Sequence, residues 1–377
     1  MLKDKILLIS VLCLLTAAEA EAQDSLDLRG QLSAYTHINP KNELPWWNGC
    51  RYIPQLNYGH NLKGSRLIDF EASANIYGNL GIHPFDSTGV NGNIKAYRLW
   101  ARYSTSQFEL RAGLQKINFG SASLLRPLMW FDQLDPRDPL KLTDGVWGVL
   151  ARYYFLNNAN LWLWGLYGND KLKGWEYIPS KKSKPEFGGR LQLPVPKGET
   201  GVSFHHRQTS INDSLTWFPR VSENRFGFDA RFDMVIGCWI EASWSAFNED
   251  IGPLSNQEII NLGADYTFGI GNGLTIIYEQ LIASNDNKPF EFDNSAVFSL
   301  LSLSYPISMF DNISAIIYYD WKYSRIYNFV TWQKQFNNIS LYLMGYINPA
   351  VYNIPTQRYD EMLYAGSGIQ LMLVFNH

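Results

Sequence analysis

The feature that most constrains this sequence is a strict alternation of apolar and polar residues with a period of two. In the segment LDLRGQLSAYTHI, Leu26, Leu28 and Leu32 share one face, while Asp27 and Arg29 share the other. The same alternation recurs in residues 67–78, 107–115, 225–233 and 260–268. A period of two is typical of β-strands that are apolar on one side and polar on the other. The chain is therefore predicted to be all-β.

Alternation alone fits both a soluble β protein and a transmembrane barrel, whose apolar face is turned to lipid. Connection lengths favour the barrel, because short turns such as 61–64 and 104–106 alternate with long loops predicted at 79–93 and 169–184. Short turns at one rim and long loops at the other are typical of an outer-membrane barrel. The fold predicted is a closed antiparallel up-and-down transmembrane β-barrel.

Aromatic residues also favour the barrel, since they gather where strands return to the short-turn rim, as an interfacial girdle would. The residues are Tyr103, Phe155, Phe232, Phe268, Tyr305 and Phe375. About eighteen segments have the length of a tilted spanning strand. That number includes a tight turn near Ser324; without it there are about sixteen.

The N-terminus is predicted to be a secretory signal peptide covering residues 1–22. Lys3 and Lys5 precede an apolar stretch from Ile6 to about Ala18, and an A-x-A site ends at Ala22. The apolar stretch is too short for a spanning helix, which needs about 20 apolar residues. Residues 23–377 are then the exported barrel, expected in the outer membrane of a Gram-negative bacterium.

Composition excludes some partners. The formal charge is only -3 and no long Lys/Arg-rich run is present, so no nucleic-acid partner is expected. The partners expected are outer-membrane lipid and small polar solutes, and the sequence leaves the oligomeric state open. No cofactor is predicted.

The last strand, GSGIQLMLVFNH, alternates Ile369, Leu371, Leu373 and Phe375 outward. Here the chain resembles the bacterial outer-membrane porin superfamily, whose final strand commonly ends in an aromatic residue. Asn376 and His377 follow Phe375, so this terminus departs from the family pattern. The strand number and the stretch LRPLMWFDQLDPRDP look most similar to alginate-export-type eighteen-strand porins.

An enzyme is not predicted, although outer-membrane phospholipases and proteases exist as barrels. Neither H-E-x-x-H nor G-x-S-x-G is present. His205 and His206 are adjacent on a strand and must face opposite sides, so they cannot share a metal. No metal site is predicted.

A Pro-stiffened, charged insert near residues 118–144 is the longest loop. We expect it to fold into the lumen as a constriction, with its apolar run against the wall; an external loop is the alternative. Its candidate constriction residues are Arg126, Asp132, Asp135, Arg137 and Asp138. The three acids could bind calcium, but Asp-Pro pairs more often begin turns, and turn chemistry is favoured.

The candidate pore-lining residues lie on the polar strand faces. They are Arg98, Arg102, Arg111, Arg152, Arg190, Arg225, Arg231, Glu241, Asp265 and Asp320. Two interpretations stay open: ion pairs between neighbouring strands, or a basic wall opposite an acidic wall that selects anions.

The function predicted is diffusion of small hydrophilic solutes, anionic ones included, through a charged lumen. The alternative is an outer-membrane enzyme or a plugged structural or adhesion barrel. Two further expectations concern single positions. Arginine at Phe228 should be costly and at Asp229 mild, and Cys50, placed in the first long loop, should be too far from Cys238 for a disulfide.

Overall fold

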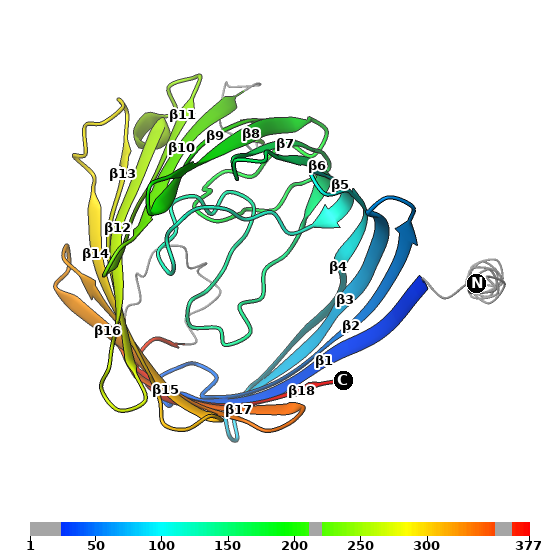
Figure 1. Ribbon diagram of the computed structural model, residues 1–377. Helices are drawn as coiled ribbons and strands as arrows, with labels where there is room; N and C mark the ends of the chain where they lie inside the picture. The colour runs from blue at the N-terminus through cyan, green and yellow to red at the C-terminus, as the bar shows by residue number, and fades with distance from the viewer. Residues whose placement is uncertain (1–23, 211–220, 351–363) are drawn as a thin grey trace.

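The computed structural model describes residues 24–210, 221–350 and 364–377, and there the chain forms one closed antiparallel barrel (Figure 1). Strands that follow one another in sequence are paired, and β1 also pairs with β18, which closes the barrel. The eighteen strands are β1 Asp24–Ile38, β2 Trp46–Leu62, β3 Arg66–Ile82, β4 Thr88–Ser104, β5 Phe108–Gln115, β6 Val146–Tyr154, β7 Asn160–Leu166, β8 Glu186–Val195, β9 Gly198–Gln208, β10 Ser222–Asp233, β11 Gly237–Phe247, β12 Asn256–Phe268, β13 Leu274–Asp286, β14 Ala296–Pro306, β15 Asp311–Asp320, β16 Arg325–Gln335, β17 Ile339–Ile347 and β18 Ser367–Asn376. A short 3-10 helix, η1 Gly252–Leu254, lies between β11 and β12.

The prediction of a closed up-and-down barrel of about eighteen strands is confirmed. The tight turn predicted near Ser324 is present. Residues 321–324 separate β15 from β16, and Ser324 adopts the left-handed backbone with φ +51°. The signal peptide predicted for residues 1–22 lies outside the described residues.

The apolar faces of the strands point outward. Large apolar side chains are exposed on strands all around the barrel, among them Phe70, Leu110, Phe228, Leu262 and Leu371. A surface this apolar is unfavourable in water and favourable against hydrocarbon. No helix among the described residues is long and apolar enough to cross a membrane.

Aromatic side chains gather at the rim that carries the short turns. Phe155, Phe232, Phe268 and Phe375 are all exposed near the ends of strands or in turns at that rim. Tyr and Phe rings suit the boundary between lipid and water. The girdle thus marks one interface of the membrane-facing band.

The prediction of a long loop over residues 79–93 is wrong. β3 and β4 continue to Ile82 and from Thr88, so only residues 83–87 connect them. Glycines interrupt the sequence pattern there, but they pair across the two strands, Gly78 with Gly92 and Gly81 with Gly89. Glycine weakens an isolated strand, whereas the paired backbone here keeps a regular ladder.

The prediction that Cys50 lies in a loop is also wrong, because here too a strand extends further than expected. Cys50 lies within β2, where it pairs with Ala34 and Gly78. Cys238 is the second residue of β11, on the short-turn side. Both cysteines carry free thiols in the structure.

The expectation that arginine would be mild at Asp229 is reversed. The Asp229 side chain is only 1% exposed and accepts two hydrogen bonds from the Arg190 guanidinium, at 2.5 and 3.0 Å. Removing one partner of a buried pair leaves the other charge uncompensated. Asp229 is therefore an unsuitable control for the lipid-facing position beside it.

We expect Phe228→Arg to destabilise the folded barrel by roughly 2–4 kcal/mol, because Phe228 points outward in mid-strand, where arginine would face hydrocarbon. Asn57→Arg, on the inner face of β2, should cost within about 0.5 kcal/mol, because among the described residues Gln55 alone donates to the Asn57 amide oxygen. Urea unfolding in lipid vesicles measures both. Equal cost at the two positions would contradict a lipid-facing outer surface.

Candidate functional site

A long segment of chain, residues 116–145, leaves the wall after β5 and crosses the barrel interior before β6 begins (Figure 1). β5 has only 8 residues and β6 only 9, whereas β2, β3 and β4 have 17 each. The chain therefore turns inward well below the height that the neighbouring wall reaches. We call residues 116–145 the insert.

Two glutamates on the opposite wall hold the insert by its backbone. Glu241 of β11 accepts hydrogen bonds from the backbone N–H groups of Ala122 and Leu128, both at 2.7 Å. Glu279 of β13 accepts from three consecutive backbone N–H groups, and the shortest of these distances, from Leu125, is 2.5 Å. Hydrogen bonds to a carboxylate are about twice as strong as neutral ones. The turn 122–128 is thus fixed against β11 and β13.

Apolar residues fix the other side of the insert. Phe119, Trp130 and Phe131 are buried in a cluster with Leu150 of β6 and Trp164 of β7. The Phe119 ring stacks on Trp164 with centroids 5.6 Å apart. Burying these large side chains away from lumen water stabilises the inward fold.

The charges of the insert are mostly paired within it. Arg126 donates to Asp132 at 2.8 Å and Arg137 to Asp135 at 2.5 Å. Burial opposes charge on Arg126, but the carboxylates of Asp132 and Glu241 outweigh it and raise the pKa of Arg126. The Asp138 carboxylate accepts from the backbone N–H groups of Leu140 and Leu142, and its burial raises its pKa.

These contacts agree with turn chemistry at Asp135 and Asp138, which accept from backbone N–H groups two to four residues further on, whereas Asp132 forms an ion pair with Arg126. In the described ranges, no three His, Cys, Asp or Glu side chains are grouped so that they could hold a metal ion. His205 and His206 do face opposite sides: His205 is buried against Trp164 and Glu186, while His206 contacts Asn224 at 2.8 Å.

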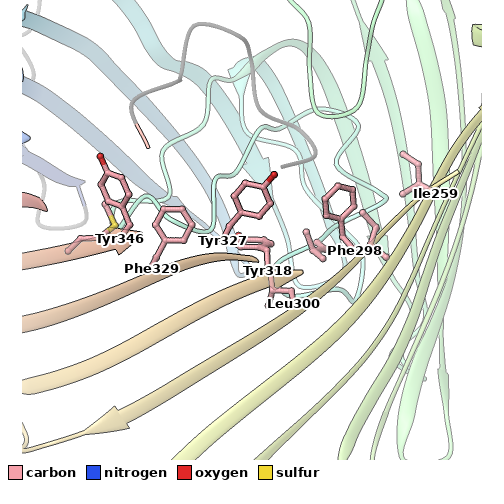
Figure 2. Close-up of a cluster of buried hydrophobic side chains, with 10 residues drawn as sticks. Ile259, Phe298, Leu300, Tyr318, Tyr327, Phe329 and Tyr346 are labelled. Carbon is pink, nitrogen blue, oxygen red and sulfur yellow. The ribbon is translucent and has the colours of Figure 1, made fainter. Parts of the chain in front are cut away.

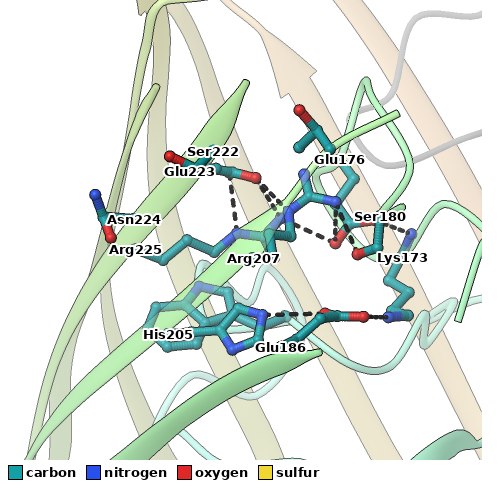
Figure 3. Close-up of polar contacts among 12 residues, drawn as sticks. Lys173, Glu176, Ser180, Glu186, His205, Arg207, Ser222, Glu223, Asn224 and Arg225 are labelled. Carbon is teal, nitrogen blue, oxygen red and sulfur yellow. Dashed lines mark hydrogen bonds and ion pairs between the residues drawn. The ribbon is translucent and has the colours of Figure 1, made fainter. Parts of the chain in front are cut away.

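A second inward segment, residues 167–185 between β7 and β8, fills the lumen beside β8, β9 and β10 (Figure 3). Glu176 pairs with Arg207 at 3.2 Å and with Arg225 at 2.9 Å. Glu223 bonds both arginines, and Lys173 lies 3.6 Å from Glu186. This network is almost completely buried, so it holds the segment to the wall and presents no charge to a solute.

The inner wall from β12 to β17 is unexpectedly apolar. Figure 2 shows side chains from consecutive strands pointing inward, including Phe298, Tyr318, Tyr327 and Phe329. All four are buried, and Leu125 of the insert belongs to the same cluster. This side of the lumen is packed like a protein core.

The space that remains lies between the insert and the wall formed by β2, β3 and β4. A cavity of about 590 Å³ opens there toward the long-loop side, and we call it the long-loop cavity. Its wall side is lined by Tyr35, Trp47, Arg51, Asn75, Tyr77, Asn79, Asn91, Lys95 and Tyr97, together with Tyr318 of β15 and Gln370 and Met372 of β18. Its other side is lined chiefly by residues 124–144 of the insert. A second cavity of about 350 Å³ is lined by insert residues alone.

The structure divides the arginines and acids expected to line the pore into two groups. The first group lies on inner faces but is covered. Arg98 donates to the Thr143 carbonyl of the insert, Arg190 pairs with Asp229, and Asp320 caps the turn at Lys322 and Tyr323. Arg225 and Glu241 are covered by the contacts described above.

The second group keeps part of its surface open. Arg102, Arg111 and Arg152 surround Glu109, at 3.5, 2.9 and 3.8 Å. Arg102 also pairs with Asp69 at 2.7 Å. Arg231 and Asp265 pair at 3.0 Å close to the short-turn rim. Arg102, Arg111 and Arg152 thus share the two carboxylates of Glu109 and Asp69. Their guanidinium groups lie against the Trp100 and Trp162 rings.

Sequence reasoning missed the wall side of the long-loop cavity. Asn75, Tyr77 and Asn79 alternate along β3, and Asn91, Lys95 and Tyr97 share the inner face of β4. The signal was present in NIYGNL and NGNIKAY, where polar or aromatic residues occupy every second position. The loop predicted at 79–93 took Asn79 and Asn91 out of the wall, whereas Asn75 and Tyr77 lay in the predicted strand 67–78 but were not included among the pore-lining candidates.

An antiparallel barrel with an inward insert is the architecture of bacterial outer-membrane porins, and known structures agree. The structure of OccAB2 from Acinetobacter baumannii aligns with a TM-score of 0.56 at 9% identity, covering 94% of this chain and 98% of that chain. OccAB4 from the same organism aligns with a TM-score of 0.55 at 10% identity, covering 95% and 98%.

The anion-selective porin of Comamonas acidovorans aligns with a TM-score of 0.50 at 12% identity, covering 94% and 100% of the two chains. No family model and no curated protein matches the sequence. Identities this low establish a shared fold: the chain has the fold of an outer-membrane porin.

We expect Glu279→Gln to loosen the insert, because the amide has one acceptor oxygen in place of two and turns a donor toward backbone N–H groups. The loss should be about 1.5–3 kcal/mol of anchoring free energy. In a planar bilayer the variant should show frequent conductance steps that the wild type lacks. Glu249→Gln, in the loop after β11, is the control; identical traces for all three proteins would contradict the anchoring role.

Proposed function

We propose that this chain is an outer-membrane porin of a Gram-negative bacterium, through which small hydrophilic solutes diffuse. The observation that carries the proposal is the contrast between its two surfaces: an apolar outer face, and an inner face on β2–β4 that lines a 590 Å³ cavity with polar and aromatic residues. Barrels of this strand number leave an aqueous lumen, and a folded-in loop narrows it.

Anion preference is the finer part of the proposal. It is supported by the partly open cluster of Arg102, Arg111 and Arg152 together with the adjacent Arg98, because these four arginines outnumber the neighbouring carboxylates Asp69, Glu71 and Glu109. Arginine stays charged at any physiological pH and binds carboxylates in two-pronged fashion. An excess of such groups along a narrow path favours anions over cations.

Within the porins, we propose that the chain is nearest in type to the eighteen-strand alginate-export porins. The support is the strand number and the aromatic, proline-rich insert. Outer-membrane lipid and small polar solutes are then its partners.

A plugged barrel with a structural or adhesive role is the alternative. It is favoured by one observation: the insert and residues 167–185 together cover the inner faces of β6 to β13. Conductance separates the two functions, since a plugged barrel passes no ions.

We expect the purified protein to conduct ions in a planar bilayer, with a reversal potential across a KCl gradient that indicates preference for chloride. Arg111→Gln combined with Arg152→Gln should move that potential toward cation preference, because two of the three cations in the cluster are lost. The charge-matched control is Lys182→Gln with Lys288→Gln, in exposed loops. Conductance with an unchanged reversal potential would refute anion selection by the cluster, and absence of conductance would refute the channel.

A further inference from the structure

Two lysines of the insert are the exception to its paired charges. Lys116 is the first residue after β5, and Lys141 lies near the other end of the insert. Within residues 24–210, 221–350 and 364–377, neither ammonium group has a hydrogen bond or an ion pair. Lys141 is exposed, and the half-buried Lys116 keeps accessible surface on its Nζ atom. A solute in the lumen can therefore reach both charges.

The two lysines lie together at the base of the insert. The ends of the insert meet at the wall, because Gln115 of β5 pairs in register with Val146 of β6. Lys116 follows Gln115 directly, and Lys141 is close enough for its charge to act on Lys116. A lysine ammonium is a compact charge on a flexible four-carbon stem. Both ammonium groups can therefore turn toward one solute.

Cations outnumber carboxylates around Lys116. Burial and the like charges of Arg98, Arg126 and Lys141 lower the pKa of Lys116, and the carboxylate of Asp132 opposes them. Asp132 is itself buried and bonded to Arg126 at 2.8 Å. The positive charge at the base of the insert thus exceeds what the nearest acid compensates.

The other acids of the insert are held by partners of their own. Asp135 binds Arg137 at 2.5 Å, and Asp144 pairs with Lys95 at 2.6 Å. Asp138 accepts from two backbone N–H groups. These carboxylates are already engaged, so the charge of the two lysines is left for an anion that enters from solution.

A cavity suited to such an anion lies beside Lys141. It is the space of about 350 Å³ lined by the insert, and exposed side chains of Asn118, Ser123 and Lys141 contribute to its lining. Leu124, Arg126 and residues 134–136 line both this cavity and the long-loop cavity, so the two spaces are neighbours. A solute that moves past the insert therefore passes close to the lysines.

The volume of this cavity favours an organic solute over an inorganic ion. It lies within the roughly 300–1,000 Å³ typical of small-molecule sites. A water molecule takes about 30 Å³ in the liquid. An ion of a few atoms would leave most of the space empty.

We propose that the base of the insert is a binding site for small dicarboxylates, with one carboxylate on Lys116, the other on Lys141, and the rest of the molecule in the 350 Å³ cavity. Two unpaired ammonium groups match two negative charges, while Asn118 and Ser123 offer hydrogen bonds to the atoms between. The inference rests on the proposed channel function, because it names solutes for which the channel holds a site. It is distinct from the arginine cluster of β4, β5 and β6, whose arginines are already paired with carboxylates.

The test is blockade of the KCl current in a planar bilayer by succinate at neutral pH. Succinamate, in which an amide replaces one of the two carboxylates, is the matched probe. Succinate should reduce the current along a saturation curve. Succinamate should need about a tenfold higher concentration for half of the effect, because one charge-assisted hydrogen bond is lost.

Two outcomes with these probes would contradict the assignment. Equal blockade by succinate and succinamate would show that the site does not read two charges. Tighter blockade by sulfate than by succinate would show a site for inorganic dianions, and the assignment to dicarboxylates would be wrong.

Two variants and their controls locate the site. Lys116→Met and Lys141→Met should each raise the half-saturating succinate concentration about tenfold and remove the difference between succinate and succinamate. Lys116→Arg keeps the charge and should keep that difference. Lys63→Met, in the exposed short turn between β2 and β3, should leave blockade unchanged. Wild-type blockade in both methionine variants of the insert, or an equal shift in Lys63→Met, would overturn the proposal.

The outcome can be separated from failure of the channel itself. A protein that conducts ions without saturable blockade by succinate refutes the dicarboxylate site alone. A protein that conducts no ions refutes the channel, and the site is then tested by calorimetric titration of the full chain in detergent with succinate. Saturable binding that Lys116→Met and Lys141→Met both weaken supports the site, and a flat titration overturns it.

Discussion

The arrangement of the interior depends on the bonds between two wall carboxylates, Glu241 and Glu279, and the backbone of residues 122–128. A loop of 30 residues leaves β5 and could extend outward into solvent. Buried backbone N–H groups must find acceptors, and here the far wall supplies them as charged oxygens. Once the turn 122–128 is fixed, the aromatic residues on either side of it are brought against β6 and β7. The position of the insert then determines which part of the lumen stays open.

As a consequence, the interior is packed differently in the two halves of the barrel. Along β6 to β17 the interior is a packed core with paired charges, and residues such as Leu281 and Leu300 are fully buried inside the barrel. Along β2 to β4 the inner face meets a cavity. A wet lumen requires polar side chains, whereas a face covered by another segment can bury apolar ones. The filled half therefore has the composition of a soluble protein core although it lies inside a transmembrane barrel.

Periodicity predicted what depends on each strand by itself, which is the direction of each face and the number of strands. Phe70, Leu110 and Phe228 point outward as expected, because a period of two fixes the side to which a residue points. Periodicity cannot tell what covers a face. Arg190 and Glu241 point inward as predicted, yet each is covered by a segment distant in sequence.

The residues that the sequence analysis missed also show that periodicity describes one strand at a time and not its neighbours. Asn79 and Asn91 continue the polar faces of β3 and β4, but the glycines nearby favoured a loop over residues 79–93 in place of the ends of these long strands. Glycine opposite glycine is a property of the strand pair, which a single segment does not reveal. The open half of the barrel was consequently the half that sequence reasoning described least.

The contrast between arginines in the two halves connects packing to function. In the filled half, Arg190, Arg207 and Arg225 each bond at least one carboxylate through two nitrogen atoms or pair with two different acids. Leaving any of them unpaired would cost several kcal/mol. Arg51 lines the cavity without a hydrogen bond or ion pair to any described residue; its guanidinium lies against the Tyr77 ring and interacts with Asp138 only at longer range. A cation is tolerated in that state where water or a solute can reach it, so the unpartnered arginine marks the side of the lumen through which a solute would pass.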